Sequence, residues 1–191
     1  MAPYSKQEIE DLIDGKLPWQ SARAIISGPK DDDRFDKYLD ILQERVPWKE
    51  RILLPLAEHL YIVAKKEERI VKCDCGYEYG DYRENWKLKA IIYVRDTEEK
   101  LDEVFFGPRK PDPKFCDVRE YYCPGCGAQL EVETVPVGYP AVFDFLPDID
   151  AFYSEWLRRP LETQYEFKDL TYELTRKWGE ESQRNEEREG Y

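Results

Sequence analysis

The sequence predicts an α+β fold: a small zinc-ribbon-like antiparallel sheet with an inserted strand–helix segment, flanked by N-terminal and C-terminal helices. Three observations predict it. Apolar residues near both ends recur at helical spacing, the middle of the chain alternates apolar and polar residues as half-buried strands do, and two cysteine-containing turns lie far apart within that middle part. We therefore expect three parts: an N-terminal helical segment over 1–50, a zinc-ribbon-like β domain with a docking helix over 51–160, and an acidic, partly helical C-terminal extension over 161–191.

Three short helices are expected in the N-terminal segment. Ser5 followed by Glu8 is a capping-box pattern, and the apolar face that follows ends at Gly15. A second helix is expected over 21–26, before a Ser-Gly-Pro stop, and a third between an aspartate triplet (31–33) and a proline at 47. Three carboxylates could hold a metal, but we favour helix capping because acidic groups are typical of helix starts. The apolar stripe of the third helix is Phe35, Tyr38, Leu39 and Leu42.

Strands are expected from residue 52 onward. The β-rich runs 60–64 and 69–72 are joined by four polar residues and predict a hairpin. Segment 86–94 alternates apolar and polar residues and predicts another strand. A helix is expected to begin at Asp96, with Leu101, Val104 and Phe105 facing inward, and the proline-rich segment 107–114 is expected to be a loop. Strands 119–122 and 129–135 should flank the second cysteine turn.

The C-terminal part predicts one capped helix and one amphipathic strip. Asp148 is a candidate N-cap and Pro160 a terminator. The apolar residues between them are Ile149, Phe152, Tyr153, Trp156 and Leu157. Beyond residue 161 the chain is acidic, and apolar residues recur at helical spacing at Phe167, Leu170, Leu174 and Trp178. Such a strip is marginal alone in water, so we expect it to pack on its own domain or on another chain.

Four of the five cysteines form two glycine-containing turns, Cys73-Asp74-Cys75-Gly76 and Cys123-Pro124-Gly125-Cys126-Gly127. Zn²⁺ binds four thiolates tetrahedrally, and two turns that each supply two thiolates close a structural site. A glycine after each pair suits a tight turn, because glycine adopts positive φ without strain. We therefore predict one structural Zn²⁺ per chain, with Cys73, Cys75, Cys123 and Cys126 as the metal ligands.

The alternatives are four reduced core cysteines or a redox dithiol. The 47 residues between Cys75 and Cys123 (positions 76–122) exceed the usual spacing of two-turn sites, so a metal would close a long loop. Cys116 matches no ligand spacing and is expected to be a free thiol.

Composition narrows the classes of function. The formal net charge of -12 disfavours nucleic acid as a partner, because that binding depends on clustered Lys and Arg. An odd number of cysteines and a cramped C-x-C predict a reducing, cytoplasmic location. No apolar run approaches the length of a membrane span. Aromatic residues make up 14% of the chain, so we expect some of them to face a protein partner.

No catalytic or cofactor-binding residue is predicted. The single histidine, His59, has no obvious nucleophile near it in sequence, and we expect an exposed or capping imidazole rather than a general base. No glycine-rich nucleotide-binding motif is present. A metal held by four thiolates has no open position for water, so it supports structure rather than activating a nucleophile.

Several longer motifs, taken together, resemble one family. They are F-x-x-Y-L-D-I-L-Q-E-R-V-P-W (35–48), C-x-C-G, N-W-K-L (85–88), V-R-D-T (94–97), R-E-Y-Y-C-P-G-C-G and D-F-L-P-D-I-D-A-F-Y-S-E-W-L (144–157). This combination resembles the acetone carboxylase gamma subunit family over about residues 4–160, and the related acetophenone carboxylases have a similar small subunit.

The resemblance implies a small structural zinc-binding subunit of an ATP-dependent ketone carboxylase, a C–C bond-forming ligase that joins bicarbonate to a ketone. It implies a cytoplasmic hetero-oligomer with large hydantoinase-like α and β subunits, no nucleic acid and no membrane. ATP and any catalytic metal would belong to those large subunits, and the zinc to Cys73, Cys75, Cys123 and Cys126.

Two points stay open from the sequence. The chain could instead be a zinc-ribbon interaction module of another multiprotein complex, or a redox enzyme that uses Cys73 and Cys75 as a dithiol. The aromatic residues of the helices over 35–42 and 152–156 could be docking elements or ordinary core.

Overall fold

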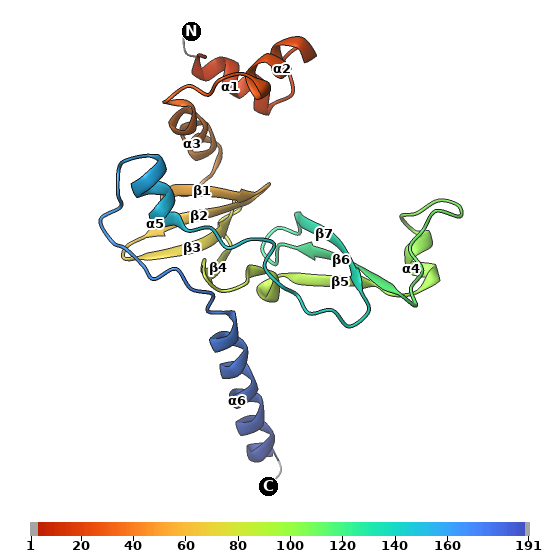
Figure 1. Ribbon diagram of the computed structural model, residues 1–191. Helices are drawn as coiled ribbons and strands as arrows, with labels where there is room; N and C mark the ends of the chain where they lie inside the picture. Colours follow the sequence, from red (N-terminus) through yellow and green to blue (C-terminus); the bar gives the residue numbers. More distant parts are fainter. Residues whose placement is uncertain (1–3, 190–191) are drawn as a thin grey trace.

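The computed structural model describes residues 4–189, with side chains described up to residue 180. It confirms the α+β fold and divides the strands between two antiparallel sheets, one in the order β1-β2-β3-β4 and one in the order β5-β6-β7 (Figure 1). The N-terminal helices lie at one side of the first sheet, and the last helix projects from the body (Figure 1). No helix of the described chain is both long and apolar enough to cross a membrane.

The three N-terminal helices are α1 (Lys6–Ile13), α2 (Trp19–Ser27) and α3 (Arg34–Arg45). The capping box is confirmed: the Glu8 N–H donates to Ser5 Oγ at 3.2 Å, and the Ser5 N–H donates to the Glu8 carboxylate at 2.8 Å. Ile9, Ile25 and Ile41, one from each helix, form a small core of their own.

The aspartate triplet does not cap α3 with a side chain. Asp33 is the N-cap residue but makes no capping hydrogen bond, and its carboxylate pairs with Lys37 at 2.8 Å instead. Asp31 accepts the Tyr4 N–H at 2.9 Å and contacts Arg34. The interpretation of these side chains as caps is therefore wrong. The Asp33 carboxylate instead pairs with a lysine, and the Asp31 carboxylate contacts an arginine and the chain that leads into α1.

The first sheet consists of β1 (Arg51–Ala57), β2 (Leu60–Lys65), β3 (Glu68–Cys73) and β4 (Glu78–Asp81). The predicted hairpin is confirmed, because β2 pairs antiparallel with β3 from Leu60↔Cys73 to Lys65↔Glu68. Successive residues of β2 face opposite sides of the sheet and pack in two different cores. Ile62 faces the main core, and Val63 faces α3. Both faces of this sheet are therefore covered.

The second sheet consists of β5 (Ile91–Arg95), β6 (Cys116–Tyr122) and β7 (Gln129–Pro136), and the two strands expected beside the second cysteine turn are confirmed. The strand expected over 86–94 is wrong in its first half, where Trp86–Lys89 forms a 3₁₀ turn, η1. The Asn85 side chain accepts the Lys87 N–H at 3.1 Å and starts that turn. Trp86 and Lys87 are both buried, so neighbouring residues do not alternate between two faces.

The helix after β5 is shorter than expected, and its N-cap lies one residue later than Asp96. α4 (Glu98–Asp102) is capped by Thr97, whose hydroxyl accepts the Lys100 N–H, rather than by Asp96. Leu101 is fully buried as expected, but Val104 is 42% exposed, because the helix ends before it. The proline-rich segment 107–114 is a loop without helix or strand, as expected.

The expected helix after Asp148 is present in two pieces, α5 (Ile149–Ala151) and a π-helical turn, η2 (Phe152–Trp156). Asp148 is confirmed as its cap, since its carboxylate accepts the Ala151 N–H at 2.9 Å. The last helix, α6 (Thr171–Glu189), begins four residues after Phe167. The interpretation that placed Phe167 on this helix is therefore wrong.

Most of the expected docking aromatics lie within the protein's own core. The Phe35 and Phe152 rings pack edge to face at 5.2 Å, which joins α3 to η2. Tyr153 is fully buried, and its hydroxyl donates to the Leu53 carbonyl at 2.8 Å. Of these aromatic residues Trp156 is the exception, because 80% of it is exposed.

Candidate metal centre

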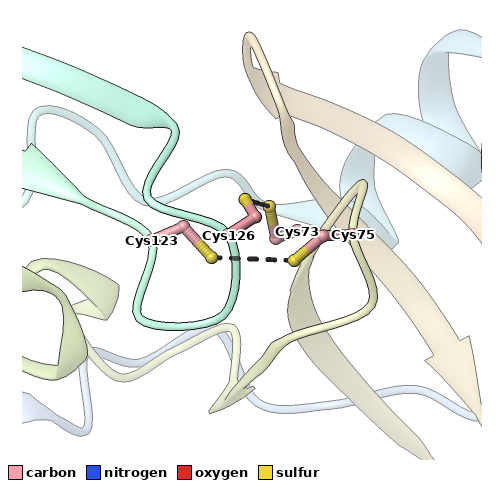
Figure 2. Close-up of side chains that lie close together, drawn as sticks. All are labelled: Cys73, Cys75, Cys123 and Cys126. Carbon is pink, nitrogen blue, oxygen red and sulfur yellow. Dashed lines mark hydrogen bonds between the residues drawn. The ribbon is translucent and has the colours of Figure 1, made fainter.

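The two cysteine turns connect neighbouring strands, one pair in each sheet. Cys73 ends β3 and Cys75 lies in the turn that leads to β4. Cys123 and Cys126 lie in the turn between β6 and β7. Figure 2 shows the two turns facing each other with all four thiols directed into the space between them. The predicted pairing of distant turns is thus present in the structure.

The spacing of the sulfur atoms fits a tetrahedral metal site. Cys73 Sγ lies 3.9 Å from Cys126 Sγ, Cys75 Sγ lies 3.8 Å from Cys123 Sγ, and all four sulfurs lie within 4.8 Å of one another (Figure 2). Four sulfurs about 2.3 Å from a zinc ion, at the corners of a tetrahedron, would be about 3.8 Å apart. The four cysteines could therefore hold a metal ion of this size.

Glycines permit this close approach. Gly76 and Gly127 have φ values of 100° and 73°, as the turn chemistry predicts. Gly125 matters for a different reason that the sequence analysis missed: a Cβ there would lie 3.0 Å from Tyr77 Cβ and 3.2 Å from Cys75 Sγ. A side chain at position 125 would push the two turns apart.

Hydrogen bonds hold the first turn in place. The Cys73 N–H donates to the Tyr77 carbonyl at 2.8 Å, and the Trp48 indole N–H donates to the Cys73 and Asp74 carbonyls at 3.1 and 3.0 Å. His59 lies in the turn between β1 and β2, and its Nδ1 is 2.5 Å from Asp74 Oδ2. The environment of the site is therefore set by the β1–β2 turn, by the segment after α3 and by Tyr77 before β4.

The thiols differ in acidity. Burial raises the pKa of both Cys73 and Cys75, which disfavours a reactive dithiol at these two residues. Burial also opposes ionisation of Cys123, but the nearby Tyr79 hydroxyl and the N–H groups of Cys126 and Gly125 lower its pKa to about 7. The buried Tyr79 hydroxyl has no hydrogen-bond partner among the described residues, so it is free to donate to a thiolate at the nearby Cys123.

The remaining sequence candidates lie outside the thiol cluster. Cys116 Sγ contacts the Asp112 carbonyl at 3.6 Å, consistent with a free thiol. His59 lines a groove of about 520 Å³ beside Asp74 and Tyr61, and none of the residues that line it is a serine, threonine, cysteine or lysine. The groove thus offers His59 no hydroxyl of serine or threonine, no thiol and no amine, and its nearest partner is the Asp74 carboxylate.

A second acidic cluster, which the sequence analysis missed, already contains a cation. Glu131, Glu133 and Asp144 converge, and the Lys87 ammonium lies 2.6, 3.1 and 2.9 Å from their respective carboxylates. Burial alone would lower the pKa of Lys87, but the three carboxylates raise it, so the ammonium stays charged. The lysine occupies the place that a metal would need. Nothing in the sequence around Lys87, which directly follows Trp86, indicates that its ammonium pairs with three carboxylates.

Comparisons with known proteins show relatives of one kind. The family model described as acetone carboxylase gamma subunit matches residues 46–157, which include all four clustered cysteines. The acetone carboxylase gamma subunit of Xanthobacter autotrophicus is 43% identical over 160 residues, covering 83% of this chain and 95% of that protein. The acetophenone carboxylase beta subunit of Aromatoleum aromaticum is 35% identical over 80 residues, covering 41% of this chain and 62% of that protein.

Proposed function

Because this chain belongs to the acetone carboxylase gamma subunit family, we propose that it is a small structural subunit of an ATP-dependent ketone carboxylase that joins bicarbonate to a ketone. The observation that carries the proposal is the match over most of both chains to a protein that is itself a carboxylase subunit. The shorter match to a subunit of acetophenone carboxylase supports the same class of complex.

The role proposed for this chain is structural. Zn²⁺ bound by Cys73, Cys75, Cys123 and Cys126 would tie the turn of one sheet to the turn of the other. Such a metal would stabilise the folded chain, because the free energy of metal binding adds to that of folding. It would have no catalytic role, because four thiolates leave no open position for water or substrate. The metal-bound cysteines would therefore fix the position of one sheet relative to the other, and the two sheets would together form the surface that partners contact.

The chemistry of carboxylation then belongs to other chains. We assign ATP, bicarbonate activation and any catalytic metal to large hydantoinase-like α and β subunits in the same cytoplasmic complex. The more extensive match is to an acetone carboxylase subunit, so acetone is the first ketone to test and acetophenone the second.

The proposal is tested by producing this chain with an affinity tag in its source organism during growth on acetone. We expect large carboxylase subunits to co-purify with it in fixed ratio, with ATP-dependent fixation of bicarbonate and about one zinc per copy of this chain. A tagged chain recovered from these cells with no carboxylase subunit attached would contradict the proposal. Zinc-free, fully folded protein would contradict only the metal assignment.

A further inference from the structure

The second sheet has an inverted distribution of polarity. Residues directly opposite each other on paired strands share a face, so the registers define two faces. One face carries Tyr121, Arg119, Glu131 and Glu133 from β6 and β7, together with Ile92 and Val94 from β5. The other carries Ile91, Tyr93 and Val132, with Glu120 and Tyr122 between them. Soluble sheets normally place the apolar face inward and the charged face outward.

The charged face is covered by the protein's own chain. The segment after β7 crosses it, where the Tyr139 carbonyl accepts a hydrogen bond from Arg119 and Asp144 pairs with the buried Lys87. The Asn85 side chain donates to the Ala141 carbonyl of the same segment at 3.1 Å. This face is therefore covered over β6 and β7, and Ile92 at the β5 edge remains 39% exposed.

The opposite face is open around Ile91, Tyr93 and Val132, whereas its far end at Arg95 is covered by α4. Ile91 and Tyr93 on β5 are 54% and 37% exposed, and Val132 on β7 is 51% exposed, on either side of Glu120 and Tyr122 of the central strand β6. Along β7 the outward positions Val132 and Thr134 are exposed, whereas Glu131 and Glu133 are half-buried. No helix packs extensively across β5–β7 within the described residues, and the sheet stands apart from the helices that cover the first sheet (Figure 1).

The charges within this open face are already neutralised. Arg95 and Glu120 are 8% and 5% exposed, and Arg95 Nε lies 2.8 Å from the Glu120 carboxylate. The Tyr122 hydroxyl donates to the same carboxylate at 2.6 Å, and Glu103 pairs with Arg95 at 2.6 Å. A partner therefore needs no countercharge here, and an uncharged surface fits best.

We propose that the open face of β5–β7, around Ile91, Tyr93 and Val132, is the surface through which this chain binds a large carboxylase subunit. The occupant is an aliphatic or aromatic protein surface without charged residues at its centre. Contiguous exposed apolar residues mark protein interfaces, and the centres of interfaces are depleted in charge. The inference rests on the proposed function, because the relatives are subunits of carboxylases.

The test uses the tagged full-length chain and the carboxylase subunits that co-purify with it. In the double variant Ile91→Glu/Val132→Glu, we expect the recovered large subunits to fall about tenfold or more, because two charges are placed at the centre of an apolar contact. The matched control is Ile26→Glu on α2, where an isoleucine is 56% exposed, close to the 54% of Ile91. The control should recover the large subunits at the wild-type level.

Zinc content and circular dichroism separate loss of binding from loss of folding. Hydroxyl-radical footprinting of the wild-type complex provides a second measurement that needs no variant. Oxidation of Tyr93 should fall several-fold in the complex relative to the isolated chain, while oxidation of Trp19, which is 71% exposed on α2, should not change.

Each outcome bears on a different conclusion. Failure of the wild-type chain to bring down carboxylase subunits overturns the proposed function. Undiminished recovery with Ile91→Glu/Val132→Glu, or unchanged oxidation of Tyr93, overturns only this interface. Equal loss with Ile26→Glu also overturns it, because the effect would not be specific to the sheet. A dimer of the isolated chain that the double variant disperses would assign this face to a second copy and overturn the proposal.

Discussion

The two sheets of this protein are stabilised in opposite ways. The first has apolar residues on both faces, covered by α3 on one side and by α5 and η2 on the other. The second encloses a lysine and three carboxylates under the segment after β7 and leaves aliphatic side chains exposed on its other face. The two meet at the cysteine cluster, to which each contributes one turn (Figure 2).

This difference shows how a small chain can fold and still present an apolar surface. Burial of apolar area drives folding of the first sheet. The second sheet gains less from burial, so its order depends more on ion pairs and on the link through the cysteines. A three-stranded sheet needs a buried hydrophobic face, or a helix packed against it, to be stable on its own.

Breaking the link should have the largest effect. Structural zinc contributes on the order of 10 kcal/mol to the folding free energy of small domains. Cys123→Ser should therefore abolish metal binding and release the two sheets from their fixed relative position. We expect insoluble or partly unfolded protein, measured by elemental analysis and by hydrogen exchange of β6 and β7. Cys116→Ser is the matched control and should be nearly silent; equal damage from both substitutions would mean that the ligand assignment is wrong.

Removing the buried cation tests the second sheet itself. Lys87→Met leaves three carboxylates facing one another without a countercharge, which should cost about 3–5 kcal/mol in free energy of unfolding. Urea unfolding at neutral pH measures this. The loss should shrink as the pH falls and the carboxylates become protonated. A pH-independent loss would indicate a packing effect instead.

The same kind of truncation should have unequal effects in the two sheets. Leu60→Ala in β2 removes a fully buried side chain and should cost about 2–5 kcal/mol. Val132→Ala in β7 removes one that is 51% exposed and should change the free energy of unfolding by no more than about 0.5 kcal/mol. Thermal and urea unfolding of both variants decide this. Similar losses would mean that the open face is covered in the isolated chain.

A smaller, pH-dependent effect is expected where α5 is anchored to the first sheet. Asp150 pairs with Arg69 at 2.6 Å; burial opposes ionisation of Asp150, but Arg69 and the Tyr165 N–H lower its pKa. A lowered pKa contributes stability above the unfolded value of about 3.9 and loses it as the pH falls through the folded value. Asp150→Asn should therefore cost about 1.5–3 kcal/mol at pH 7 and progressively less below pH 4. A difference that stays constant down to pH 2 would contradict this assignment.

The parts of the fold that the sequence predicted well are those with local causes. The Ser5–Glu8 capping box, the Asp148 cap and the β2–β3 hairpin each depend on residues within one or two turns of chain. The thiol cluster was also predictable, although it joins distant segments, because only a few residue types bind zinc and they recur in recognisable turns.

The misses share a different cause. The alternating pattern of 86–94 predicted a strand, yet Lys87 turns inward because its three partners come from 131, 133 and 144. The sequence pattern is equally compatible with docking and core roles for Phe35 and Phe152, and the contact between their rings in the structure assigns both to the core. Neither pattern contains information about partners more than 40 residues away.

What the sequence determined by itself was the identity of the elements, the four sulfurs that face one another and the family to which the chain belongs. Those properties depend on residue type and local spacing, which the sequence shows directly. Only the tertiary structure decided which face of the second sheet is covered. That outcome depends on the path of the segment after β7, because a strand pattern is the same whichever of its two faces the rest of the chain covers.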